Sequence, residues 1–562
     1  MRKEIEAITR RNRLFAIVFM GFLGLGAWNK MAGQDAFFPA QGTRGMVSSA
    51  HPLATRVGLE ILKKGGNAFD AAVAVAAALN VVEPAMSGMG GYGTILVYSA
   101  KDKAIRFLNC SGRIPAGLNP DIFRPPYPNY AKNRTGAAAV STPGNVNAWE
   151  AMSKRYGRLG WRDLFGPAID LAEAGFALDI RGANTIRSAF AAFPEAAKAI
   201  YGKDGAAPGN GHRLIQKDLA RSLRAVAEKG AVEFFRGSIG RAIAGEVRRR
   251  GGALSPEDLA GNEAEWWDPI RIDYRGYAVF TASPPSTAFC SLIRLGLMSR
   301  FDVASLGSNT VEFLHLFCEA TKHAFWCRLK YAGDPAVTPS PLERLLSADY
   351  WKEQAAAIDP ARAKPFVYPG VDPARESHTT HFVVADAEGN IVCATQTLGN
   401  AFGSRIMAPG TGIWLNNSLA YCTFEPKGNP MDAHPGRRKL SGDCPTIILK
   451  DGRPWAALGT PGGHSIGQTV PQMVMNLIDF KMNIRAALAA PLVSFVEPDV
   501  IAVERGIPEA VRKALEAKGH KIQLVRGLSN AHGLTIELGP DGKPVRFQGA
   551  SDPRGTGLAL GY

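Results

Sequence analysis

Two runs rich in β-branched residues, joined by a short polar turn, constrain the fold of this chain more than any other segment. The runs cover residues 379–384 and 391–397, and the turn at 386–390 contains Asp, Gly and Asn. Such a pattern predicts a β-hairpin. With the middle residue of the turn at the centre of the hairpin, Thr379 lies opposite Thr397, and their Cβ atoms are roughly 5 Å apart. The hairpin then places two hydroxyl groups side by side at its open end.

A threonine hydroxyl is a poor nucleophile without a base that takes its proton. The α-amine of a chain's first residue can be that base, because its pKa is about 7.7–8.0. Thr379 becomes a first residue only if the chain is cut before it. The hypothesis is therefore self-cleavage between His378 and Thr379. Taken alone, however, two threonines on a strand commonly reflect β-propensity only.

The rest of the chain mixes helical and strand patterns. Helices are predicted over 53–82 with an interruption at Gly65-Gly66, across most of 147–251 and over 311–330, and strands over 94–98 and 104–108. These patterns alone predict only a mixed α and β fold.

Further short motifs occur along the chain before and after the hairpin. They are residues 45–49, 62–74, 87–93, 141–144, 415–417, 435–438, 459–463 and 550–555. Each motif is weak alone, but in this order and spacing residues 45–562 resemble the γ-glutamyltranspeptidase (glutathione hydrolase) family of N-terminal nucleophile hydrolases. The resemblance implies an α+β fold, an αββα sandwich of two antiparallel sheets between helical layers. It also implies a large subunit, residues 45–378, and a small subunit, residues 379–562, which form one interleaved heterodimer.

The resemblance implies catalytic roles for four residues. Thr379 corresponds to the nucleophile and new N-terminus, and Thr397 to the hydroxyl that bonds its α-amine. Gly462 and Gly463 correspond to the oxyanion-hole glycines. Glycine allows backbone N–H groups to approach a developing oxyanion closely.

The departures from the family concern the substrate. Ser111 stands where the family has an Arg that binds the α-carboxylate of the glutamyl group, and Arg113 is the candidate substitute. The family's Asn that helps to hold the glutamyl group falls at Gly399, with Asn400 beside it.

The α-amine contacts change as well. Ser418 and Tyr421 stand where the family has the Gln and Asp that hold this amine, and of two paired serines Ser441 is kept while the second is Gly442. A charge-assisted hydrogen bond contributes about 1.5–3 kcal/mol, so the loss of the Arg and the Asp matters for recognition of the head group.

Three functions remain open. The leading hypothesis is a self-processing γ-glutamyltransferase or glutathione hydrolase that cleaves γ-glutamyl amide bonds of a small molecule. The substituted pocket favours, as an alternative, an acylase of the cephalosporin or glutaryl type. The third is a processed but inactive binding protein, against which the retained Thr379 and Thr397 argue.

The N-terminus has a basic start followed by an uncharged apolar run over 14–28. This is typical of a secretory signal and short for a membrane span. We predict that residues 1–33 are a signal peptide or an N-terminal membrane anchor and that the protein is periplasmic or secreted. A cytosolic amphipathic start is the remaining alternative.

Composition excludes several other classes. The formal net charge of +15 is dispersed, and the densest cluster in the body, Arg248-Arg249-Arg250, ends a predicted helix, where basic residues favour the helix dipole. We therefore predict no nucleic-acid partner. The seven cysteines show no disulfide framework and no CxxC pair, and no His-Glu-x-x-His motif occurs. We predict no cofactor and no catalytic metal.

Overall fold

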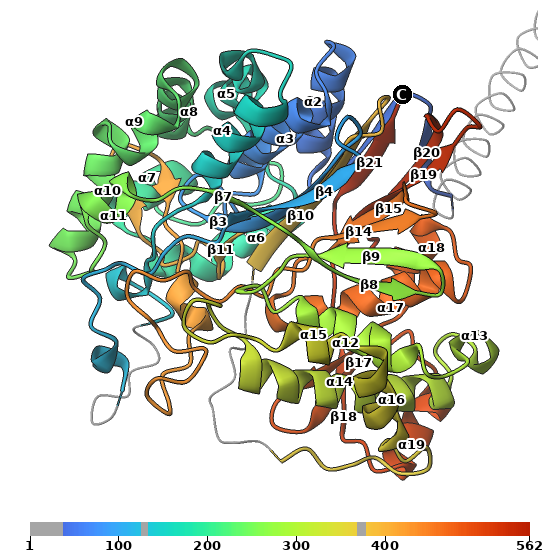
Figure 1. Cartoon of the computed structure of the whole chain (residues 1–562). Coiled ribbons are helices and arrows are strands. Elements are labelled where there is room, and N and C mark those ends of the chain that lie inside the picture. The colour runs from blue at the N-terminus through green and yellow to red at the C-terminus, as the bar shows by residue number, and fades with distance from the viewer. Residues whose placement is uncertain (1–37, 125–132, 368–377) are drawn as a thin grey trace, which may run out of the picture.

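Two antiparallel sheets lie face to face, and helices cover both outer faces, in the computed structural model, which describes residues 38–124, 133–367 and 378–562 (Figure 1). The first sheet has the strand order β21 (Leu558–Gly561), β2 (Gly45–Ser49), β10 (His378–Asp386), β11 (Ile391–Gly399), β3 (Tyr92–Ser99), β4 (Ala104–Cys110) and β7 (Glu265–Trp267). The second has the order β1 (Ala40–Gly42), β20 (Pro544–Ser551), β19 (His532–Leu538), β15 (Arg453–Gly459), β14 (Thr446–Lys450), β9 (Tyr277–Thr281) and β8 (Ile270–Tyr274). This confirms the predicted αββα sandwich.

The helices divide between the two outer faces. The helices of the N-terminal part are α2 (Pro52–Lys63), α3 (Ala68–Val82), α4 (Asn145–Tyr156), α5 (Gly166–Ala174), α6 (Ile180–Ala189), α7 (Glu195–Tyr201), α8 (Lys217–Lys229), α9 (Ala231–Phe235), α10 (Ser238–Arg249) and α11 (Pro256–Ala260). Those beside the second sheet are α12 (Phe289–Met298), α13 (Val303–Leu306), α14 (Val311–Tyr331), α15 (Leu342–Leu345), α16 (Ala348–Ala356), α17 (Ile466–Ile478), α18 (Ile484–Ala489) and α19 (Glu509–Ala517).

Three small sheets complete the fold. They pair β5 (Phe176–Ala177) with β6 (Arg213–Leu214), β12 (Met407–Ala408) with β13 (Ile413–Trp414), and β16 (Val493–Val496) with β17 (Val500–Glu504) and β18 (Ile522–Val525).

Alternation of side chains along the central strands builds the core between the sheets. Val383 and Cys393 point between the two sheets, whereas Phe382 and Val384 pack against the helices of the first layer. Successive side chains of a strand point to opposite faces, and here both faces are covered by protein. The strands are therefore apolar on both sides, which explains their continuous β-branched runs.

The central hairpin has the predicted register. Thr379 pairs with Thr397, and the pairing continues without a shift to Ala385 and Ile391. The turn closes through a hydrogen bond from the Asp386 N–H to the Asn390 carbonyl (3.2 Å). The register that the sequence predicted for the two hydroxyl groups is thus confirmed.

The interrupted first helix is also confirmed. Helix α2 ends at Lys63, and α3 begins after the N-cap Asn67, whose side chain accepts hydrogen bonds from the N–H groups of Phe69 and Asp70. Gly65 between them has φ +94°, a conformation that glycine adopts readily. Two helices joined by a sharp turn therefore replace one long helix.

The chain segments before and after residue 378 share both large sheets. Strand β10 lies between β2 and β11, and β14 lies between β9 and β15. Neither segment could form its sheets without the other. This interleaving fits the expectation that two cleavage products would stay together.

Several further predictions have outcomes here. Helix α14 and the strand pair β3 and β4 confirm the predicted elements, and Arg249 and Arg250 at the end of α10 bond Glu246. All seven cysteines are buried and unpaired. The predicted signal peptide or anchor, residues 1–33, lies outside the described residues. Within the described residues, no helix has the length and apolarity needed to cross a membrane.

The C-terminal motif at 550–555 holds the last strands to the second helical layer through Arg554. Its guanidinium binds Glu504 (2.6 and 2.8 Å) and Asp552 (2.9 Å) and donates to the carbonyls of Leu488 and Ala490. Both carboxylates are buried. Removal of the arginine would leave two buried charges without their cation.

We expect Arg554→Ala to lower the free energy of unfolding by about 3–5 kcal/mol, because breaking a buried pair leaves uncompensated charge. Chemical denaturation of the purified protein measures the loss. The control is Arg546→Ala, which removes an exposed pair with Glu537 and should cost less than about 1 kcal/mol. Equal effects of both variants would contradict the structural role of Arg554.

Candidate active site

The two threonine hydroxyls meet at the open end of the central hairpin. The Thr379 Oγ1 donates to the Thr397 Oγ1 at 3.2 Å. Thr397 Oγ1 donates in turn to the His378 carbonyl (2.7 Å) and accepts from the Gly399 N–H (2.7 Å). Thr379 is 4% exposed, so the uncut chain covers it. The hydroxyl of Thr397 therefore contacts both Thr379 and the carbonyl of the peptide bond before it.

Neighbouring side chains on the same face of the sheet are polar. Tyr92 pairs with Thr397 on the adjacent strand, and His381 and Thr395 form the next row. The His381 Nδ1 lies 2.8 Å from the Thr395 Oγ1. Burial lowers the pKa of His381 well below its usual value, so the ring is neutral. His381 is held inside the sandwich by these contacts.

The predicted oxyanion glycines follow strand β15, which faces the hairpin across the sandwich. Gly462 and Gly463 have φ +142° and +59°, and these values favour glycine. Within the described residues, no hydrogen bond takes up their two backbone N–H groups. Free N–H donors are what an oxyanion hole requires.

Close approach of the backbone leaves little room for a side chain at Gly442. A Cβ atom at this position would lie 2.9 Å from the Gly463 carbonyl oxygen. Ser441, the retained serine, accepts a hydrogen bond from the Asp443 N–H through its Oγ (3.2 Å). The segment 441–443 thus packs directly against Gly463, one of the two predicted oxyanion-hole glycines.

The side chain of Asn417 approaches the backbone of Gly399 closely. Its φ is +99°, and a Cβ atom there would lie 2.0 Å from the Asn417 Oδ1. The same Oδ1 accepts the Asn400 N–H (2.9 Å). A side chain at position 399, including the Asn expected from the family resemblance, therefore has no room in this backbone.

Ser418 and Ser141 form a buried hydroxyl pair. Their Oγ atoms bond each other, and the Asn416 Oδ1 accepts from the Ser141 N–H (3.1 Å) and from the Ser418 N–H (3.1 Å). Ser418 thus fixes the loop before Tyr421. It carries no charge that could replace a carboxylate.

Arg113 already has an anionic partner. Its Nη2 lies 2.6 Å from a Glu265 carboxylate oxygen, and its Nη1 donates to the Gly436 carbonyl (3.3 Å). The cavity that Arg113 lines is also lined by Asp334 and Arg438 but by neither Thr379 nor Thr397. Ser111, by contrast, is buried, and its Oγ has no partner within the described chain.

Two charged residues near the hairpin were not singled out from the sequence. Lys439 and Asp443 flank the Ser441-Gly442 pair, and both are buried. The Lys439 Nζ lies 3.3 Å from the centroid of the Tyr92 ring and 5.4 Å from that of Tyr421. Their position on either side of the predicted Ser441-Gly442 motif is the feature of the sequence that could have identified Lys439 and Asp443.

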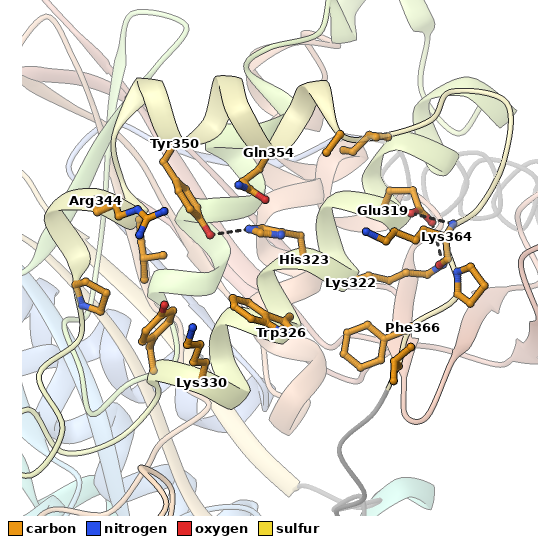
Figure 2. A pocket seen from close by; sticks show the side chains of 17 residues that line it. Glu319, Lys322, His323, Trp326, Lys330, Arg344, Tyr350, Gln354, Lys364 and Phe366 are labelled. Atoms are coloured by element: carbon orange, nitrogen blue, oxygen red, sulfur yellow. Dashed lines mark hydrogen bonds and ion pairs between the residues drawn. The ribbon is translucent and has the colours of Figure 1, made fainter.

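A separate cavity of about 480 Å³ lies beside α14 and α16 (Figure 2). Lys322, Lys330 and Arg344 are among its lining residues, together with the rings of Trp326 and Tyr350. None of the predicted site residues lines it. It is a basic and aromatic hollow outside the catalytic hairpin.

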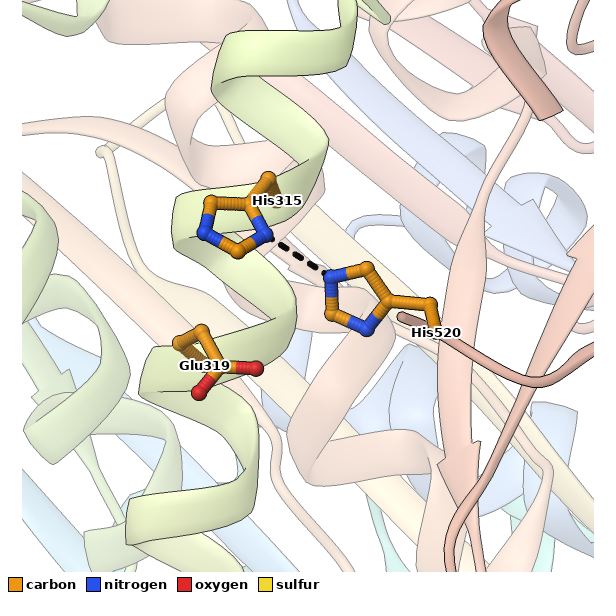
Figure 3. Close-up of side chains that lie close together, drawn as sticks. All are labelled: His315, Glu319 and His520. Atoms are coloured by element: carbon orange, nitrogen blue, oxygen red, sulfur yellow. Dashed lines mark hydrogen bonds between the residues drawn. The ribbon is translucent and has the colours of Figure 1, made fainter. Parts of the chain in front are cut away.

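His315, Glu319 and His520 lie close enough to hold a metal ion (Figure 3). The two rings hydrogen-bond each other (Nδ1 to Nε2, 2.9 Å), and Glu319 pairs with the Lys322 ammonium (2.9 Å). A cation already neutralises the carboxylate. The cluster therefore has the contacts of a hydrogen-bonded link between α14 and the C-terminal part.

Comparisons with known proteins agree with this geometry. The family model Gamma-glutamyltranspeptidase matches residues 54–562. The chain is 36% identical to the glutathione hydrolase proenzyme of Escherichia coli over 94% of each chain, and 37% identical to the acylase ACY 1 proenzyme of a Pseudomonas species over 90% of this chain and 91% of that protein. The structure matches cephalosporin acylase from Bacillus halodurans with a TM-score of 0.85 at 31% identity, covering 93% of this chain and 97% of that one.

Fold and site together define an N-terminal nucleophile hydrolase. The chain belongs to the γ-glutamyltranspeptidase family and is an enzyme, which confirms the resemblance found in the sequence. The hypothesis of an inactive binding protein loses its support. Relatives of both the glutathione hydrolase and the acylase type match at similar identity, so family membership alone does not identify the acyl group of the substrate.

We expect Gly399→Asn, which restores the family's residue, to destabilise the protein by roughly 1–3 kcal/mol, because the side chain would meet Asn417 and strain the backbone. The shift of the thermal midpoint measures this. The matched control is Gly410→Asn: Gly410 also has positive φ (+72°), but no atom lies within 4 Å of an added Cβ. If both variants unfold at the same temperature, the contact with Asn417 is not what excludes a side chain.

Proposed function

We propose that this enzyme cuts itself between His378 and Thr379 and that the new N-terminal Thr379 then cleaves γ-glutamyl amides through an acyl-enzyme. The observation that carries the proposal is the Thr379–Thr397 hydroxyl contact, with Thr397 also bonded to the His378 carbonyl. The products, residues up to 378 and residues 379–562, would remain one interleaved heterodimer.

Self-cleavage would begin with attack of the Thr379 Oγ1 on the His378 carbonyl carbon. The hydrogen bond from Thr397 polarises this carbonyl and would stabilise the negative charge that develops on its oxygen. The C–N bond then breaks, the nitrogen takes the hydroxyl proton, and an ester joins residues 378 and 379. Water hydrolyses the ester and leaves a carboxylate on His378 and a free α-amine on Thr379.

The mature enzyme would use that amine as its base. The α-amine takes the Thr379 hydroxyl proton during attack on the substrate amide and returns it to the leaving amine. The N–H groups of Gly462 and Gly463 would receive the oxyanion. Water or a second amine then attacks the acyl-enzyme ester, giving hydrolysis or transfer.

An acylase of the glutaryl or cephalosporin type is the second candidate. Ser111, Gly399, Ser418 and Tyr421 replace the groups that hold the glutamyl head in the family. The similarity to acylases in sequence and structure supports the same alternative. Both candidates use Thr379 in the same way and differ only in the acyl group.

We expect Thr379→Ala to remain one uncut chain without amidase activity, whereas Thr379→Ser, which keeps a hydroxyl, is cut and active at a reduced rate. A denaturing gel and N-terminal sequencing of the smaller fragment check the cut, and hydrolysis of a γ-glutamyl anilide checks the activity. An uncut wild-type chain with full activity contradicts the proposal.

We expect the processed protein to prefer a γ-glutamyl anilide over a glutaryl anilide by roughly tenfold or more in kcat/KM, because a charge-assisted bond to the α-amine is worth about 1.5–3 kcal/mol. The two substrates differ only by that amine. Preference for the glutaryl compound would assign the protein to the acylase alternative.

A further inference from the structure

Two opposite charges are buried beside the nucleophile without contacting each other. Lys439 is 1% exposed and Asp443 is 3% exposed. In the described part of the chain, neither an ion pair nor a hydrogen bond joins them. Buried charges are normally paired, because they lose their hydration. Two opposite charges that are buried apart from each other lose hydration without gaining an ion pair, and this is energetically unfavourable.

Each charge has few protein partners. The Lys439 ammonium donates to the Leu440 carbonyl (2.9 Å) and lies over the Tyr92 ring, and Asp443 accepts from the Thr94 Oγ1 (3.3 Å). An ammonium has three donors, and only one of them is used here. Burial lowers the pKa of Lys439 and raises the pKa of Asp443, and the attraction between the two charges offsets part of each shift.

Both charges contact β3, the strand beside the one that carries Thr397. Tyr92, under the Lys439 ammonium, is the cross-strand partner of Thr397, and Thr94, which bonds Asp443, is the partner of Thr395 in the following row. These side chains occupy the inter-sheet face that also carries Thr379. The two charges thus lie against the same polar patch as the nucleophile.

The segment that carries both charges also runs beside Arg113 and Tyr421, two of the predicted head-group residues. Arg438, the residue before Lys439, pairs with Arg113 in an isolated antiparallel bridge. The Lys439 ammonium is also near the Tyr421 ring. Lys439 thus places a cation near Tyr421, and Asp443 places an anion further along the same segment.

Unpartnered polar groups lie on β3, on β4 and directly after β4. The Tyr92 hydroxyl, the Asn109 Nδ2 and the Ser111 Oγ are buried and have no hydrogen-bond partner in the described chain. Asn109 pairs with Thr94 across β3 and β4. Buried polar groups normally have partners, so such a group of donors indicates a place prepared for a polar ligand.

We propose that Lys439 and Asp443 select the acyl group, with Lys439 binding the carboxylate and Asp443 the ammonium of a zwitterionic α-amino-acid head. This inference rests on the proposed function, since it assigns the head group of the acyl chain that Thr379 would carry. A head with both charges satisfies both residues. A head with one charge leaves the other residue unpaired.

Four anilides separate the two charges. The γ-glutamyl compound has both, the glutaryl compound only the carboxylate, the 4-aminobutyryl compound only the ammonium, and the butyryl compound neither. We expect Lys439→Met to lower the kcat/KM ratio of γ-glutamyl over 4-aminobutyryl at least tenfold. We expect Asp443→Asn to lower the ratio of γ-glutamyl over glutaryl at least tenfold.

Controls distinguish recognition from folding. Lys101→Met removes an exposed lysine and should leave both ratios unchanged. A denaturing gel that shows the two processed fragments identifies the variants that fold. If Lys439→Met or Asp443→Asn fails to fold, Lys439→Gln or Asp443→Ser takes its place. A merely structural role would lower all four rates together and leave the ratios as they are.

Measurements of ligand binding test this inference independently of the proposed catalytic function. Calorimetry with free L-glutamate and glutarate measures the head group without turnover, and we expect L-glutamate to bind more tightly and Asp443→Asn to remove the difference. A cut protein that binds in this way but hydrolyses no anilide contradicts the proposed function alone. Unchanged ratios and unchanged binding in both variants overturn the inference.

Discussion

The contact between the hydroxyls of Thr379 and Thr397 is the interaction around which the rest of this structure is arranged. It exists because one hairpin register places the two residues opposite each other. A slip of one residue would turn every side chain of the strand to the other face. The apolar core between the sheets prevents this, because Val383 and Cys393 must stay inside it. The sandwich therefore fixes the position of Thr379, the proposed nucleophile, at the end of a central strand.

Interleaving of the chain adds a second constraint. Strand β10, which begins with the proposed cut, is held on both sides by β2 and β11. A cut at this place would free an amine without freeing the strand. Thr397 would then exchange the His378 carbonyl for other partners, while the backbone around Thr379 keeps its pairing. The same hydroxyl can thus serve first the cleavage of the chain and later the orientation of the α-amine.

At the positions predicted to bind the head group, close packing matters as well as charge. Gly399 and Gly442 stand where an added side chain would meet Asn417 or the Gly463 carbonyl, so neither family residue fits this backbone. Lys439 and Asp443 enter the same neighbourhood from the segment that carries Gly442. In the proposed mechanism, the chemistry at Thr379 and the selection of the acyl group would be supplied by different segments, so that one could change while the other is kept.

The sequence by itself determined the local features: the hairpin register around Thr379, the break between α2 and α3, the helix α14 and the family. Each depends on residues near one another in the chain or on an ordered set of motifs. Tertiary structure alone decided which side chains face each other across the sandwich. The pairing of Arg113 with Glu265, the contacts that exclude a side chain at Gly399, and the approach of Lys439 to Tyr92 join residues far apart in the sequence. Packing of two sheets brings such residues together, and no local pattern records it.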